Sequence, residues 1–200
     1  MPILEKTLRH LTEKDPTLTV LNLSRHYPLS IADMQALANA LRGNPYIAKL
    51  VLCEDGIEDE GARILSEVLP TMSSLVELDV SVNNIGDKGA AALFHVAVSP
   101  HVPTLRILNI AANSVTDKAA GQLLENQTLH CVNLDGNSVS PALIARIDVQ
   151  LESNETRELR AEFSRFIENL SSPDELELAL SAAKESLQAR AGKESVPVMQ

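Results

Sequence analysis

Three aspartates at a repeated position are the side chains in this sequence best placed to act together. Asp59, Asp87 and Asp117 each stand two residues after an Ile or Val that closes a hydrophobic motif. A row of carboxylates could hold metal ions, because hard cations prefer oxygen ligands. A carboxylate at a helix start also accepts hydrogen bonds from the first backbone N–H groups and lies at the positive end of the helix dipole. We interpret the three aspartates as helix caps and predict no metal site.

The histidines and cysteines form no catalytic pattern. His95 and His101 are six residues apart across a Pro-containing loop, which is not the spacing of a zinc site. Cys53 has no identifiable His and acid partners in its repeat register. The glycines belong to turns and helix starts, and none forms a phosphate-binding loop. We therefore predict that the protein is not an enzyme and has no cofactor, with an enzyme whose site is not recognisable as the alternative.

The elements that position these residues follow a unit that is complete within residues 75–93. Leu78 and Val80 alternate with polar residues, as in a strand with one buried face. Ile85 and Leu93 fall at helical spacing further along the unit. A strand and a helix of this size cannot bury their apolar sides alone, so the unit is expected to stack on copies of itself.

The pattern Leu-x-x-Leu-x-Leu-x-x-Asn-x-Leu recurs along the chain. Its copies start at positions 18, 47, 75, 105 and 129, so successive starts are 29, 28, 30 and 24 residues apart. This period indicates a full helix after each strand, and the short last interval predicts a shorter helix or tighter turn after Leu124. The chain resembles leucine-rich repeat proteins of the ribonuclease-inhibitor-like class. The resemblance implies an α/β solenoid of five β-α repeats, with parallel strands on the concave face and helices on the convex face.

The segments outside the repeats are predicted to cap the solenoid, because terminal repeats expose core unless covered. Leu4, Leu8 and Leu11 form one face of an N-terminal helix, and Ser140-Pro141 begins a closing helix. A further helix is expected at 156–170, and another after a capping box at Ser172. The predicted parts are an N-terminal helical cap at 1–16, five repeats at 17–140, a C-terminal helical cap and tail helix at 141–191, and a disordered tail at 192–200.

An asparagine occupies the same position of three repeats, as Asn83, Asn113 and Asn137. A buried amide at this position can donate to and accept from the backbone of neighbouring loops. We predict that the three form a structural ladder. Asp55 and His26 replace the amide in the second and first repeats, so the ladder is expected to be imperfect there.

Side chains between the leucines are predicted to line the concave face. Such a surface is extended and rigid, and solenoids bind their partners on it. It has no Trp, Tyr or Phe, whereas tight interfaces are enriched in aromatic and Arg anchors, so we expect a contact of modest affinity or one that also uses the C-terminal helices. The residues predicted to bind a partner protein are Lys49, Glu77, Asp79, Ser81, Asn109, Asn133 and Asp135.

The composition narrows the class of partner and compartment. A net charge of −10 disfavours binding to nucleic acid and to anionic membrane surfaces. No apolar run approaches the length of about 18 residues that a membrane span needs. Cys53 and Cys131 lie three strands apart in the repeat register, which is too far for a disulfide and indicates a reducing compartment such as the cytoplasm. The sequons at Asn22, Asn126, Asn154 and Asn169 are then best interpreted as chance matches.

Two protein-binding hypotheses follow. The first is a non-enzymatic scaffold that acts inside a cell. One version of this hypothesis is a bacterial effector that acts in host cytosol. Its Glu-rich C-terminal sequence resembles the export signals of type IV effectors such as those of Legionella, although an ordinary solvated helix has the same composition. The second is a eukaryotic intracellular regulatory module that resembles the repeat domains of tropomodulin or of nucleotide-sensing immune receptors, for which a neighbouring domain would be expected.

Overall fold

Strands and helices alternate along almost the whole chain. The computed structural model describes residues 2–25, 28–99 and 104–168. The helices are α1 (Pro2–Thr12), α2 (Ile31–Leu41), α3 (Asp59–Val68), α4 (Asp87–Ala97), α5 (Asp117–Ala120) and α6 (Pro141–Glu168), with short 3₁₀ helices η1 (Leu69–Thr71) and η2 (Gly121–Glu125). The strands are β1 (Val20–Asn22), β2 (Lys49–Val51), β3 (Glu77–Asp79), β4 (Ile107–Asn109) and β5 (Cys131–Asn133).

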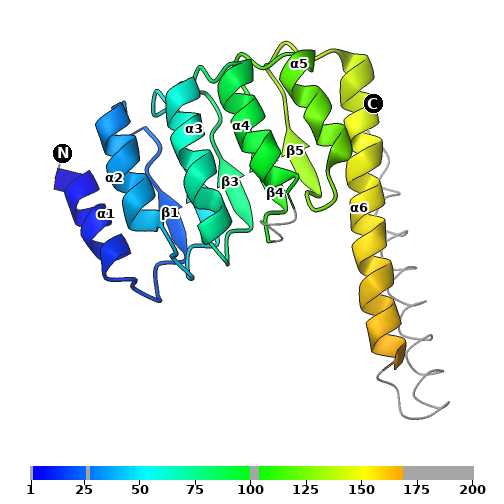
Figure 1. The fold of residues 1–200 in the computed structure, drawn as a ribbon, viewed down its shortest axis with the longest axis horizontal. Coiled ribbons are helices and arrows are strands. Elements are labelled where there is room, and N and C mark those ends of the chain that lie inside the picture. The colour runs from blue at the N-terminus through cyan, green and yellow to red at the C-terminus, as the bar shows by residue number, and fades with distance from the viewer. Residues whose placement is uncertain (1, 26–27, 100–103, 169–200) are drawn as a thin grey trace, which may run out of the picture. The chain divides into compact units, whose positions relative to one another are not determined.

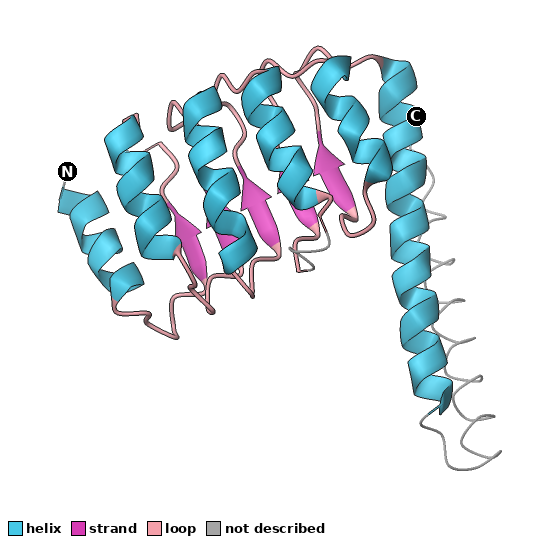
Figure 2. Ribbon diagram, viewed as in Figure 1, coloured by secondary structure: helices cyan, strands magenta, loops and turns pink. Residues whose placement is uncertain are grey.

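The strands form one parallel sheet in the order of the sequence, and the helices stack beside one another along one of its faces (Figures 1 and 2). Leu50 aligns with Leu78, and Leu78 with Leu108, as the repeat register predicts. A one-residue slip would turn every core leucine to the other face, so the hydrophobic pattern fixes the register. The predicted leucine-rich repeat fold is confirmed.

The core lies between the sheet and the helices. The central leucines of β2 and β3 are fully buried, as are Leu65 of α3 and, at 1% exposure, Leu93 of α4. Ser30 caps α2 in a reciprocal capping box with Asp33, which fixes the start of that helix. Ile31, the first residue of α2, is 51% exposed, whereas Met34 one turn further on is buried.

The shortened fourth repeat is accommodated by a shorter helix, as predicted. α5 has only 4 residues and continues as the 3₁₀ helix η2, which has 5 residues. A 3₁₀ helix rises more per residue than an α-helix, so a segment of few residues still spans the repeat before the chain returns to β5.

The chain divides into two units, residues 1–155 and 156–200. The first contains the whole sheet, and α1 covers its first repeat with the buried residues Leu4 and Leu11. We predicted a new helix at 156, but α6 is continuous from Pro141 to Glu168. Asn154 does not end the helix, because its side-chain amide instead donates to the backbone oxygen of Leu129 at 3.0 Å. The predicted helix after Ser172 and the tail lie outside the described residues.

Candidate protein-binding face

Asparagine side chains connect the loops that follow the strands. The Asn83 oxygen accepts hydrogen bonds from the backbone N–H groups of Asp55 at 3.0 Å and Ile57 at 3.1 Å. Its amide nitrogen donates to a carbonyl oxygen of the preceding repeat at 2.6 Å. Asn113 and Asn137 make equivalent bonds one and two repeats further on. Each repeat therefore satisfies the loop backbone of the one before it.

The residue before each ladder position has a left-handed backbone conformation. These residues, called here the left-handed row, are Arg25, Glu54, Val82, Ala112 and Gly136, with φ values of 60°, 61°, 58°, 51° and 70°. Glycine adopts such φ values without strain, whereas a β-branched residue rarely does. Val82 is the β-branched member of the row, and 46% of it is exposed. An apolar side chain is thus presented to solvent from a strained backbone.

Carboxylate and amide oxygens close a turn at the end of most strands. Those of Asn22, Asp79, Asn109 and Asn133 each accept from the backbone N–H two residues further on, at 2.9, 2.9, 3.2 and 3.0 Å. Val51 offers no acceptor in the second repeat, where the hydroxyl of Ser24 accepts from the Cys53 N–H instead, at 3.2 Å. This column of side chains therefore supports the loop backbone in addition to lining the face.

Asp79 is held in place by its neighbours. One carboxylate oxygen accepts from the hydroxyl of Ser81 at 2.6 Å, and the other accepts from the amide of Asn109 at 3.0 Å. We expected these residues to face solvent. Asp79 and Asn109 are instead half-buried, and Ser81 is only 6% exposed, because its hydroxyl turns toward the carboxylate.

Two ion pairs neutralise much of the remaining charge on this face. Lys49 Nζ lies 2.7 Å from Glu77 Oε1 on the next strand, and Arg25 pairs with Glu54 along the left-handed row. Of the acids assigned to the concave face, Asp135 and Asp79 take part in no ion pair between described residues. Asp135 is exposed. The sheet face therefore carries its unneutralised negative charge toward the C-terminal repeats.

The apolar side chains of the face lie beside these charges. Val20 and Ile107 occupy the same column as Lys49 and Glu77 and are 52% and 36% exposed. Val20, Ile107 and Val82 were not among the residues predicted from sequence to bind a partner. The signal that could have identified Val82 is its position directly before a ladder asparagine.

The three aligned aspartates reach the next helix rather than their own. Asp59 begins α3, and its Oδ1 accepts from the backbone N–H groups of Gly86 at 2.8 Å and Gly89 at 2.9 Å, at the start of α4. Asp87 accepts from Thr116 before α5 in the same way. Our prediction that each carboxylate caps its own helix is wrong in this respect. The repeats stack closely enough for one helix start to serve the next.

Two of these carboxylates have perturbed acidities. The backbone N–H and hydroxyl of Thr116 donate to Asp87 and lower the pKa of that carboxyl below its usual value. Hydrogen bonds from Ser140, chiefly from its backbone N–H, lower the pKa of Asp117 in the same manner. Both groups are stabilised as carboxylates, which suits structural acceptors and disfavours a role as general acid.

Other candidate groups are dispersed. Among the described residues there is no cluster of three or more His, Cys, Asp or Glu side chains that could hold a metal. Cys53 and Cys131 are free thiols. Within those same residues every helix is too short or too polar to cross a bilayer. Asn126 and Asn154 are buried, so the folded chain does not present these sequons for modification.

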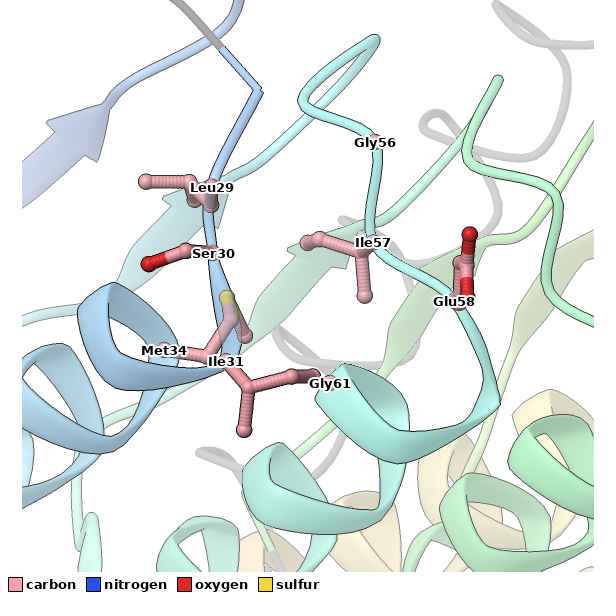
Figure 3. Close-up of a pocket in the computed structure, with 8 residues that line it drawn as sticks. All are labelled: Leu29, Ser30, Ile31, Met34, Gly56, Ile57, Glu58 and Gly61. Atoms are coloured by element: carbon pink, nitrogen blue, oxygen red, sulfur yellow. The ribbon is translucent and has the colours of Figure 1, made fainter.

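A pocket of about 210 Å³ lies between the first two repeats. Figure 3 shows Ile31 and Met34 of α2 beside Ile57 and Gly61, which belong to the second repeat. Glu58, the residue before α3, makes no side-chain cap there. The pocket is lined by apolar and polar groups in equal measure and brings no acid and base together, so it offers no catalytic arrangement.

Comparison with known proteins agrees with this architecture. A sequence family described as a leucine-rich repeat matches residues 71–94. The structure of actin-binding site 2 of leiomodin-1 is similar with a TM-score of 0.68 and 19% identity, covering 82% of this chain and 98% of that one. The tropomodulin C-terminal domain of Caenorhabditis elegans gives a TM-score of 0.69 and 23% identity, covering 80% and 98%. The chain therefore has a leucine-rich-repeat-like α/β fold, similar to that of these two domains.

Proposed function

We propose that this protein is a non-catalytic protein-binding module that holds its partner on the concave face of the sheet. The observation that supports this most is Val82, which is exposed, apolar and strained at once. The left-handed conformation recurs in every repeat and belongs to the loop geometry, so the feature particular to Val82 is an exposed β-branched apolar side chain at such a position. Val82 lies in the loop that follows β3, the middle strand of the five, and we assign it to the rim of the proposed contact surface.

The proposed contact surface combines the predicted residues with this apolar position. Asp79, Asn109, Asn133 and Asp135 supply acceptors and negative charge, so the partner segment opposite them should carry basic groups. Lys49 and Glu77 form a neutral pair that a partner would cover. Ser81 has little exposed surface, and we assign it the role of orienting Asp79. No aromatic anchor is included, which favours modest affinity.

The similarity to tropomodulin and leiomodin supports an intracellular regulatory module more strongly than a bacterial effector. We propose that its repeats are of the ribonuclease-inhibitor-like class. The leiomodin-1 domain is an actin-binding site, so actin is the first partner to test. At 19% and 23% identity, the comparison supports the shared fold. The actin assignment therefore depends on the experiment.

A bacterial effector that acts in host cytosol is the second form of the proposal. It is supported by the Glu-rich C-terminal sequence from Pro173 to Gln200, which resembles type IV export signals. A translocation reporter fused to the full chain, and to a chain without the last 20 residues, tests it. Loss of translocation on truncation supports an export signal, whereas absence of translocation by both fusions refutes this form.

The test of the concave face uses Val82→Glu. The row already contains a glutamate with the same backbone conformation at Glu54, so the variant should fold. We expect binding of labelled monomeric actin, measured by fluorescence anisotropy, to weaken by about tenfold or more, since an apolar contact becomes a charge. Lys88→Glu, at an exposed position of α4, is the control and should bind as the parent does.

If actin does not bind the parent chain, the same two variants are compared in a pull-down from cell lysate with mass spectrometry. Proteins retained by the parent and by Lys88→Glu, but lost with Val82→Glu, are candidate concave-face partners. A partner that binds all three chains equally contradicts the assignment of this face.

A further inference from the structure

The strand β5 ends the sheet with an open backbone edge. Its Cys131 N–H donates to the carbonyl oxygen of Arg106 at 3.1 Å. The Asn133 carbonyl accepts from the N–H of Ile110 at 3.1 Å. Successive residues of a strand direct their backbone groups to opposite edges, so the N–H and C=O of Val132 point away from β4. In the described part of the chain, no strand pairs with β5 from that side.

The same edge borders a cavity of about 310 Å³ beside α6. Val132 and Leu151 contribute its apolar lining. Leu108, which aligns with Val132 on β4, is 1% exposed, whereas Val132 itself is only half-buried. The last repeat therefore leaves a core position incompletely covered, next to a backbone that can still accept a strand.

Three exposed carboxylates define the other side of this cavity. They are Asp148, Glu152 and Glu155 of α6. Spacings of four and three residues place them on one flank of the helix. The cavity thus combines an open strand edge, two apolar side chains and an acidic wall, and His130 and Cys131 complete its lining.

We infer that this edge, called here the β5 edge, docks an extended basic segment of a partner protein as a sixth strand of the sheet. The segment would form main-chain hydrogen bonds with Val132 and place an apolar side chain over Val132 and Leu151. Lysine or arginine side chains would extend to the acidic flank of α6. Strand addition to an open edge gives affinity through the backbone, and side-chain pockets give specificity.

The negative charge of the β5 edge favours a basic protein segment over a second copy of the chain, nucleic acid or anionic lipid. A second copy of the chain would bring its own net charge of −10 to an acidic wall. Nucleic acid and anionic lipid carry the same sign of charge and are repelled as well. The β5 edge is a different surface from the concave face, so this inference holds or fails independently of the proposed function.

The experiment uses a capped, fluorescein-labelled peptide of alternating lysine and valine, seven residues long, with the full chain. We expect fluorescence anisotropy to show binding, and amide hydrogen exchange to show that the Val132 N–H becomes protected by about tenfold or more in the complex. A peptide N-methylated at every backbone nitrogen keeps its charge but cannot donate main-chain hydrogen bonds in either strand direction. It should lose most of the affinity.

Two double variants distinguish binding to the acidic flank of α6 from attraction by the net charge of the whole chain. Asp148→Lys with Glu155→Lys should weaken peptide binding by about tenfold or more, because both are on the acidic flank. Glu60→Lys with Glu67→Lys changes the net charge equally on exposed positions of α3 and should leave binding within about twofold.

Four results would overturn the inference. One is the absence of binding, and another is an equal loss of affinity in both double variants, which would indicate attraction by net charge alone. The third is undiminished binding of the N-methylated peptide, and the fourth is binding that leaves the Val132 amide unprotected. The peptide comparison needs no protein variant, so it stands even if one of the variants fails to fold.

Discussion

Asp59 and Gly89, 30 residues apart in sequence, are joined by a 2.9 Å hydrogen bond from the glycine N–H to the aspartate Oδ1. The approach is so close that a Cβ atom on residue 89 would lie 2.8 Å from the Cα of Asp59 and 2.8 Å from its Oδ1. Two consecutive helix starts therefore meet at a point where only glycine fits.

Gly89→Ala is expected to lower the free energy of unfolding by about 1–3 kcal/mol, because the new methyl group meets backbone that cannot move freely. Denaturant unfolding followed by circular dichroism measures this. Ala119, the corresponding residue of the next helix start, is the reference position: Ala119→Gly should cost only about 0.5–1 kcal/mol through backbone entropy. Equal effects at the two positions would mean that the close approach is relieved by small shifts.

Asp87 is expected to contribute to the dependence of the unfolding free energy on pH. Hydrogen bonds from Thr116 lower its pKa in the folded chain below the usual value of 3.8, so the folded state favours the carboxylate. This contribution is complete above the unfolded pKa and is lost as the pH falls through the folded pKa. Asp87→Asn should therefore reduce the loss of stability between pH 6 and pH 3, measured by urea unfolding at both values. An unchanged pH dependence would exclude Asp87 from this role.

The asparagine ladder should be more sensitive where it is more deeply buried. Asn83 is fully buried and Asn113 is half-buried. Replacement by alanine leaves loop N–H and C=O groups without partners, at a cost of about 1–3 kcal/mol at each position. We expect Asn83→Ala to be at the upper end and Asn113→Ala at the lower end, measured by thermal and denaturant unfolding. Neutral behaviour of both would contradict the ladder.

The strand register could be predicted from sequence because leucines at period two leave only one way to bury every core position. The columns built from Val20, Lys49 and Glu77 align in the structure as the pattern predicted. The direction in which Asp59 reaches could not be predicted in this way. Sequence spacing places a carboxylate along its own helix, whereas the distance to the next helix start depends on how tightly the repeats stack.

The left-handed conformation at Val82 could not be predicted either, because it also depends on the three-dimensional arrangement of the repeat. Local propensity opposes it, and the loop geometry between the strand and the ladder asparagine imposes it. The same applies to the half-burial of Asp79. Its column was predicted correctly, but the turn it closes with Ser81 depends on side-chain orientation that the repeat pattern does not specify.

Val82→Gly should not destabilise the protein, which is unusual for removing a side chain of that size. Glycine relieves strain of about 1–2 kcal/mol at a positive φ and costs about 0.5–1 kcal/mol in unfolded-state entropy. The expected net result is a gain of up to about 1 kcal/mol, measured by urea unfolding. Ala112→Gly in the same row has no β-branch to relieve and should gain less. A clear loss of stability in Val82→Gly would show that the valine side chain packs in the free protein.

Asp79 allows charge and hydrogen bonding to be separated on the concave face. Asp79→Arg removes acceptors for Ser81 and Asn109, so we expect a loss of about 1–3 kcal/mol of stability along with any loss of binding. Asp79→Asn is the cleaner variant, because asparagine already closes the same turn at Asn109 and Asn133.

Asp79→Asn keeps the turn acceptor for Ser81 but loses the acceptor for the Asn109 amide, so we expect it to cost about 1 kcal/mol of stability, less than Asp79→Arg, and to weaken partner binding measurably if the carboxylate meets a basic group. Asp135→Asn, at an exposed position, should weaken binding in the same direction without structural cost. Isothermal titration with the identified partner measures both, with Lys88→Glu as the control. Normal binding by both aspartate variants, together with loss of binding on deletion of residues 172–200, would assign the interaction to the C-terminal part of the chain instead of the concave face.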